Sequence, residues 1–106
     1  MPRFLIYAPD YPDHLAERYA VRPEHLERNK SDPAGLVAYS GPIAPRIGTK
    51  QRDTEPPAGQ LNLAGSFMVW NMDNIDQAWA RVKEDVYWRA GVWDKERLIV
   101  EELLDI

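Results

Sequence analysis

The sequence contains no cysteine and only two histidines among its 106 residues. Without cysteine, the chain cannot form disulfides, Fe–S clusters, thiolate zinc sites or a cysteine nucleophile. Two histidines cannot by themselves supply three zinc ligands, and the spacing of His14 and His25 fits no standard metal motif. The sequence also lacks both common glycine-rich phosphate loops. We therefore expect neither a metal nor an organic cofactor.

The chain also lacks an excess of positive charge and any long apolar run. Its net charge is −4 at pH 7, which disfavours a nucleic-acid binder because such proteins normally present a net basic face. No apolar run approaches the ~18 residues that a membrane span needs. The apolar stretch at the start is too short for a secretory signal. We expect a cytoplasmic protein that binds neither nucleic acid nor membrane.

The length is typical of one domain, residues 1–106, with one core. Short apolar runs bounded by proline, glycine or acidic turn residues predict four strands, at residues 3–8, 36–43, 65–72 and 97–104. A proline- and glycine-rich stretch at residues 44–62 predicts a long loop, either a solvated connection or a lid over a site.

Helices are predicted between these strands. Asp13 is expected to cap a short first helix and Pro23 to begin a second one, because proline is tolerated at the first helical position but not in a helix interior. Asp73 is expected to cap an amphipathic helix whose apolar stripe faces the sheet and on which Arg81 faces water. A short helical turn is expected at residues 85–90.

The resulting element order is strand, helix, strand, strand, helix, strand. This order is typical of the ferredoxin-like split βαβ arrangement, an α+β fold with one antiparallel sheet and its helices on one face. The first and last strands are apolar on both sides, so the face without helices also needs cover. Two sheets packed face to face would provide it, and we expect a homodimer.

Two stretches of the sequence look familiar when taken together. One is Arg22–Pro23–Glu24–His25–Leu26, and the other is the run Asp-Val-Tyr-Trp-Arg-Ala-Gly-Val-Trp at residues 85–93. With the serine–glycine pairs between them, their order and spacing resemble the YciI-like family of small dimeric α+β-barrel proteins. The family usually has proline after the aspartate, where this chain has Val86, and in this it resembles the fungal-type variant.

The resemblance implies a ferredoxin-like monomer, a barrel-forming dimer and a pocket in which a histidine and an aspartate act as a pair. The matching positions here are His25 and Asp85. Related activities in the family concern small cyclic or aromatic substrates, including removal of chloride from a chlorinated hydroxyquinol. Most members have no assigned reaction.

The residues themselves give His25 and Asp85 both a chemical and a structural interpretation. An imidazole titrates near neutrality and is suited to proton transfer, and a carboxylate can orient it. Alternatively, His25 is a hydrogen-bonded helix residue at a dimer interface, and Asp85 is the N-cap of the short turn that follows it. The two roles of Asp85 are compatible.

Six further side chains are candidates for binding a substrate. Arg18 and Arg22 lie four residues apart and can clamp an anionic group, although ion pairs with neighbouring acids are the alternative. The hydroxyl and aromatic candidates are Tyr7, Ser40, Ser66 and Trp88. Core or interface packing is the alternative for the aromatic residues.

The sequence therefore predicts a cofactor-independent enzyme of general acid–base type. It would act on a small cyclic or aromatic molecule by elimination, isomerisation or decarboxylation, with His25 moving the proton and Asp85 orienting it. The alternatives are a domain that binds a small ligand without chemistry, and a domain that serves only for dimerisation.

Overall fold

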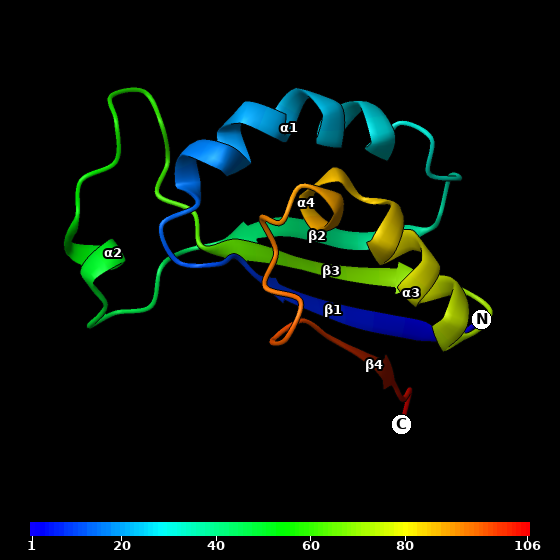
Figure 1. Cartoon of the computed structure of the whole chain (residues 1–106). Coiled ribbons are helices and arrows are strands. Elements are labelled where there is room, and N and C mark those ends of the chain that lie inside the picture. Colours follow the sequence, from blue (N-terminus) through cyan, green and yellow to red (C-terminus); the bar gives the residue numbers. More distant parts are fainter.

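The computed structural model describes all residues, 1–106. Its elements, in chain order, are β1 (Arg3–Pro9), α1 (Leu15–Asn29), β2 (Val37–Ile43), α2 (Lys50–Asp53), β3 (Gly65–Asn71), α3 (Ile75–Glu84), α4 (Val86–Arg89) and β4 (Ile99–Leu103). The four strands form one sheet in the order β2-β3-β1-β4, with every neighbouring pair antiparallel. Figure 1 shows α1, α3 and α4 together above this sheet. The predicted ferredoxin-like α+β fold is confirmed.

Strand β1 shows how the sequence gives the sheet two different faces. Successive side chains of a strand point to opposite faces. Phe4 and Ile6 are buried beneath the helices, whereas Leu5 and Tyr7 lie on the opposite face and stay partly exposed. Because all four residues are apolar or aromatic, the strand is suited to burial on both sides.

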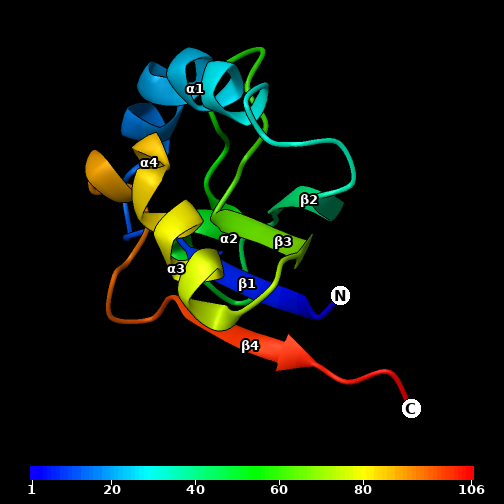
Figure 2. The same cartoon turned by 90° about the vertical axis from the view of Figure 1, so that its right-hand side faces the viewer.

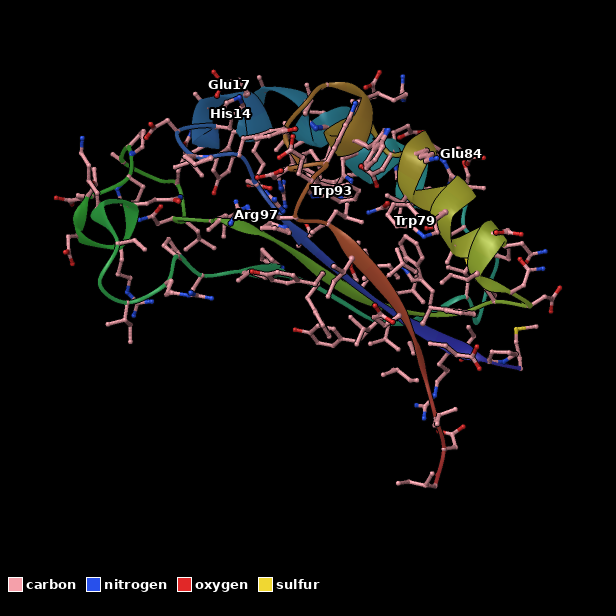
Figure 3. The ribbon with its side chains drawn as sticks, turned by 60° about the horizontal axis from the view of Figure 1, so that its bottom comes forward. His14, Glu17, Trp79, Glu84, Trp93 and Arg97 are labelled. Atoms are coloured by element: carbon pink, nitrogen blue, oxygen red, sulfur yellow. The ribbon has the colours of Figure 1, made fainter.

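The core lies between the sheet and the three helices. Trp93, on the segment that leads to β4, is fully buried there, and Figure 3 shows it between the helical layer and the sheet. The other buried apolar side chains of this core are Phe4, Ile6, Ala8, Met68, Trp70, Met72, Ala78, Val82, Val86, Tyr87, Val92, Leu98 and Val100. None of the helices combines the length and the apolar composition that crossing a bilayer requires.

No helix covers the other side of the sheet, as Figure 2 shows. We call this side the open face. From the strand register it carries the apolar and aromatic side chains Leu5, Tyr7, Tyr39, Phe67, Val69 and Ile99. Tyr39 and Ile99 are 56% and 44% exposed, so the apolar character predicted for both sides of the sheet is present.

The predicted break of the first helix is wrong. Helix α1 runs without interruption from Leu15 to Asn29, with Pro23 in its interior and His14, not Asp13, at its N-cap. A proline inside a helix costs about 3 kcal/mol. Here Arg18 and His25, on either side of Pro23, are both held by polar contacts to other parts of the chain. These contacts offset the cost of the proline, so the helix stays continuous.

Two further predictions about the helices need correction. The N-cap of α3 is Asn74, not Asp73, because the Asn74 side chain accepts the N–H of Gln77. Arg81 does not face water but is 5% exposed, since it ion-pairs with buried carboxylates beneath α1. The loop at residues 44–62 also contains a short helix, α2, which is capped by Thr49 and lies beyond the end of the sheet (Figure 1).

Candidate active site

The structure brings His25 and Asp85 into contact although 60 residues separate them in sequence. Nδ1 of His25 lies 2.8 Å from Oδ1 of Asp85. His25 comes from the second half of α1, and Asp85 occupies the junction between α3 and α4. The His25 side chain is 17% exposed and that of Asp85 only 2%. A buried carboxylate therefore holds an imidazole that solvent can still reach.

Asp85 is fixed by the local structure around it as well as by His25. It is the N-cap of α4, and its Oδ1 accepts the backbone N–H of Tyr87 at 3.0 Å. Burial alone would raise its pKa. The hydrogen bond and charge of His25, the Tyr87 N–H and the charge of Arg81 outweigh burial and hold the pKa of Asp85 below its ordinary value. The capping role and the pairing with His25 thus coexist.

Arg81 and Asn29 complete the polar surroundings of the pair. Arg81 places Nη1 3.3 Å from Oδ2 of Asp85 and Nη2 2.8 Å from Oδ1 of Asn29. Nδ2 of Asn29 in turn lies 3.2 Å from Nε2 of His25. Asp32 anchors Arg81 from the other side, with a 2.7 Å contact to Nε. Asn29 and Arg81 are therefore both held in position next to the imidazole and its carboxylate.

An aromatic ring stacks against the imidazole of His25. Tyr87 stacks on His25 with ring centroids 4.1 Å apart and an interplanar angle of 21°. The guanidinium of Arg18 lies 4.5 Å from the centroid of the same ring. Tyr87 is 2% exposed, and burial raises the pKa of its hydroxyl. The ring is therefore a neutral platform for His25 across the physiological range.

A cavity of about 170 Å³ opens beside His25. The helical side supplies its polar wall and the sheet supplies Val37, Ser40, Met68 and Trp70; the complete lining is His25, Asn29, Asp32, Val37, Ser40, Met68, Trp70, Arg81 and Asp85. A cavity of roughly 150 Å³ is known to hold benzene. The space therefore suits one six-membered ring with a few polar substituents.

Ser40 is the one predicted substrate-binding residue that the structure brings to this cavity. Arg18 and Ser66 lie elsewhere, in the core. Arg18 is 5% exposed, contacts both carboxylate oxygens of Asp10 at 2.9 and 3.1 Å, and donates to Oγ of Ser66 at 2.9 Å. Burial raises the pKa of Asp10 to about 6, and the charge and hydrogen bond of Arg18 offset only part of that rise. These residues form a structural cluster.

The other three candidates also lie away from the cavity. Tyr7 is on the open face and lines a separate hollow of about 620 Å³ at the end of the sheet. Arg22 is exposed on α1 and forms no ion pair. Trp88 packs edge-on against Trp79, with centroids 6.3 Å apart, and Lys95 lies over its ring. The aromatic residue next to the imidazole is Tyr87, the neighbour of the predicted Trp88.

The sequence analysis missed Asn29, Asp32 and Arg81 as parts of the site. A signal for two of them was present. Asn29 follows His25 by four residues, and Arg81 precedes Asp85 by four, so each lies on the same helix face as its partner. His14 takes no part, because its Nδ1 contacts the Pro12 carbonyl. No three histidine or acidic side chains cluster closely enough to hold a metal ion.

Comparisons with known proteins agree with this fold. The sequence model of the YCII-related domain family matches residues 2–102. Protein YciI of Escherichia coli is 32% identical over 92 residues, which cover 86% of this chain and 87% of that protein. Aspercryptin biosynthesis cluster protein B of Emericella nidulans is 30% identical over 95 residues, and the match spans only 55% of that longer protein.

A solved structure resembles the chain over almost its whole length. It is 5-chloro-2-hydroxyhydroquinone dehydrochlorinase (TftG) from Burkholderia phenoliruptrix AC1100, in complex with 2,5-dihydroxybenzoquinone. The TM-score is 0.74 at 23% sequence identity, with 96% of this chain and 93% of the other covered. At this identity the likeness shows a common fold.

Proposed function

The chain belongs to the YCII-related domain family, and from this premise we propose that it is a cofactor-independent enzyme of general acid–base type acting on a small cyclic or aromatic molecule. The observation that carries the proposal is the contact between His25 and Asp85 at the wall of a cavity the size of one ring. We further propose that residues 1–106 form a single YciI-like domain.

In the proposed reaction, Nε2 of His25 takes a proton from the bound ring. Asp85 accepts a hydrogen bond from Nδ1 and stabilises the imidazolium that forms, because its own lowered pKa keeps it charged. In an elimination, the electron pair of the broken bond to hydrogen moves into the ring, and the leaving group departs as an anion with its bonding pair. Ser40 offers a hydroxyl to a ring oxygen.

An elimination is favoured over isomerisation or decarboxylation by one comparison. The solved structure of similar fold is that of a dehydrochlorinase, bound to a dihydroxybenzoquinone. Its ligand is a single oxygenated ring, which is the class of molecule that a cavity of about 170 Å³ can hold. We therefore propose hydroxylated single-ring compounds as the substrate class and a lyase reaction as the chemistry.

The test is to replace each of the two histidines in turn. General acid–base help contributes roughly 10²–10⁴ in rate, so we expect His25→Ala to lower chloride release from a chlorinated hydroxyhydroquinone by at least about a hundredfold. His14→Ala is the matched control and should leave the rate unchanged, since His14 does not reach the cavity. Equal rates for His25→Ala and the unaltered protein would exclude the proposed role.

A binding domain without chemistry is the alternative, because the same cavity could hold a ring that is never transformed. The two functions differ in their dependence on Asp85. Binding of 2,5-dihydroxybenzoquinone, followed by its visible absorbance, should persist in Asp85→Asn in either case. Only an enzyme loses turnover in this variant, because the imidazolium then lacks its carboxylate.

We also propose a homodimer formed through the open face. Tyr39 and Phe67 lie on it with ring centroids 6.0 Å apart, and Leu5 and Val69 pair beside them. Contiguous apolar patches of this kind are rare on monomeric soluble proteins. Two open faces packed against each other would bury these side chains in the way that sheets stack in a sandwich.

A further inference from the structure

The nitrogen of His25 that the proposed reaction uses already has a neighbour within the chain. Asn29, one helical turn further along α1, places its side-chain nitrogen 3.2 Å from Nε2. Arg81 holds the other end of the amide, with Nη2 2.8 Å from the Asn29 oxygen. Arginine can only donate hydrogen bonds, so the amide oxygen must face it and the NH₂ group must face Nε2.

This orientation determines which nitrogen of His25 carries the proton. The NH₂ group of Asn29 can only donate, so Nε2 must accept with an unprotonated lone pair. The proton of the neutral imidazole is then on Nδ1, from which it is donated to Asp85. Arg81 donates to both Asn29 and Asp85, so the four side chains form a closed ring of four hydrogen bonds, each with one donor and one acceptor.

Protonation of His25 disrupts this ring. The imidazolium carries N–H groups on both nitrogens, so its Nε2–H would meet the NH₂ group of Asn29, donor against donor. Turning the amide around would not relieve the conflict, because the NH₂ group would then face the guanidinium of Arg81. Asn29 is therefore held in the orientation that opposes the imidazolium, whereas Asp85 favours it.

We infer that Asn29 is a positioning residue that fixes the proton of the neutral His25 imidazole on Nδ1 and occupies the lone pair of Nε2 until a substrate donor displaces the amide. The inference deepens the proposed function and rests on it. A substrate must compete with an N–H donor for the lone pair of Nε2. The site therefore selects rings that present an acidic hydroxyl at this point over rings that present only acceptors.

No other group near the imidazole can produce the same effect. The sheet contributes only uncharged side chains to the cavity. The titratable and charged groups that face His25 or its direct partners are Asp85 and Arg81 from α3 and its C-terminal end, Tyr87 from α4 with Arg18 over its ring, and Asp32 beyond α1. Among the uncharged groups, only the Asn29 amide contacts Nε2.

The test is to follow the imidazole nitrogens of the full-length protein by NMR across a pH series. In the unaltered protein at alkaline pH, we expect His25 to carry its proton on Nδ1. In Asn29→Ala, the pH at which His25 becomes protonated should rise by about half to one unit, the effect of removing one opposing hydrogen-bond donor. In Asn29→Asp it should rise further, because a carboxylate accepts from both Arg81 and Nε2–H. His14 is an internal reference whose titration should not move.

Two results would overturn the inference: a proton on Nε2 in the unaltered protein, or a His25 titration that does not rise in Asn29→Ala. Asn29→Asp preserves side-chain size and the contact to Arg81, so it remains informative if Asn29→Ala fails to fold. Asn74→Asp adds the same charge at the N-cap of α3 and controls for charge alone. The measurement needs no substrate, so its outcome is separate from the loss of turnover expected of His25→Ala.

Discussion

The two arginines that lie four residues apart on α1 differ in their burial. Arg18 is 5% exposed and bonded to Asp10 and Ser66, whereas Arg22 is exposed and unpaired. Removing one partner of a buried ion pair leaves an uncompensated charge, which costs about 3–5 kcal/mol. We expect Arg18→Met to lose that much free energy of unfolding in urea. Arg22→Met should leave the urea midpoint nearly unchanged, and equal losses would contradict the structural role of Arg18.

The lowered pKa of Asp85 predicts a specific dependence of stability on pH. A group whose pKa is lower in the folded state than in the unfolded state stabilises the fold above its unfolded value, here about 3.8. That contribution is lost as the pH falls through the folded value. At pH 7, Asp85→Asn should therefore cost about 1–3 kcal/mol.

The stability difference between the unaltered protein and Asp85→Asn should shrink as the pH falls below about 4. Urea unfolding at a series of pH values measures it, and Asp53→Asn, an exposed carboxylate without a side-chain partner, is the control. A difference between the unaltered protein and Asp85→Asn that stays constant from pH 7 to pH 3 would mean that Asp85 stabilises the fold only as a cap.

At the scale of secondary structure, α1 is the element whose observed structure differs most from what its sequence predicts, because it continues through Pro23. Pro23 has no backbone N–H, so α1 lacks the hydrogen bond that another residue at this position would donate to the Tyr19 carbonyl. Pro23→Ala should restore that bond and raise the stability by about 1–3 kcal/mol. Thermal unfolding should show a midpoint higher by several degrees. Arg22→Ala, on the same helix, is the control, and an unchanged or lower midpoint for Pro23→Ala would contradict this account.

The strands could be predicted because their signal is local. Residues 3–8 and 65–72 are short apolar runs between breakers, and the observed strands β1 and β3 differ from them by one residue. The continuity of α1 could not be predicted, because the contacts that offset Pro23 come from outside the helix, from Asp10 just before it and from Asp85, 60 residues after His25. A propensity rule weighs only neighbours along the chain.

The same reason limited the prediction of the site. His25 and Asp85 were proposed from motifs that resemble a family, not from any sign that they touch. Arg81 was predicted to face water because a charged residue on an amphipathic helix usually does. Its burial depends on Asp32 and Asn29, which α1 brings over α3 only in the folded chain.

At the scale of the whole molecule, the proposed dimer can be tested by placing a charged side chain on the open face. Val69 lies in the middle of that face, between Leu5 and Tyr39. Light scattering after size exclusion should give twice the chain mass of 12.2 kDa for the unaltered protein and a single chain mass for Val69→Lys. Glu24→Lys, on the helical side, should leave the dimer intact. A monomeric unaltered protein would exclude the proposal.

The central position of β1 has a consequence for how the chain folds. Strand β1 pairs with β3 on one edge and β4 on the other, and both of these come from the second half of the 106 residues. During synthesis β1 is therefore an apolar strand with two unpaired edges until β3 and β4 have also been made. Such distant pairings close slowly, and exposed strand edges invite association with other chains.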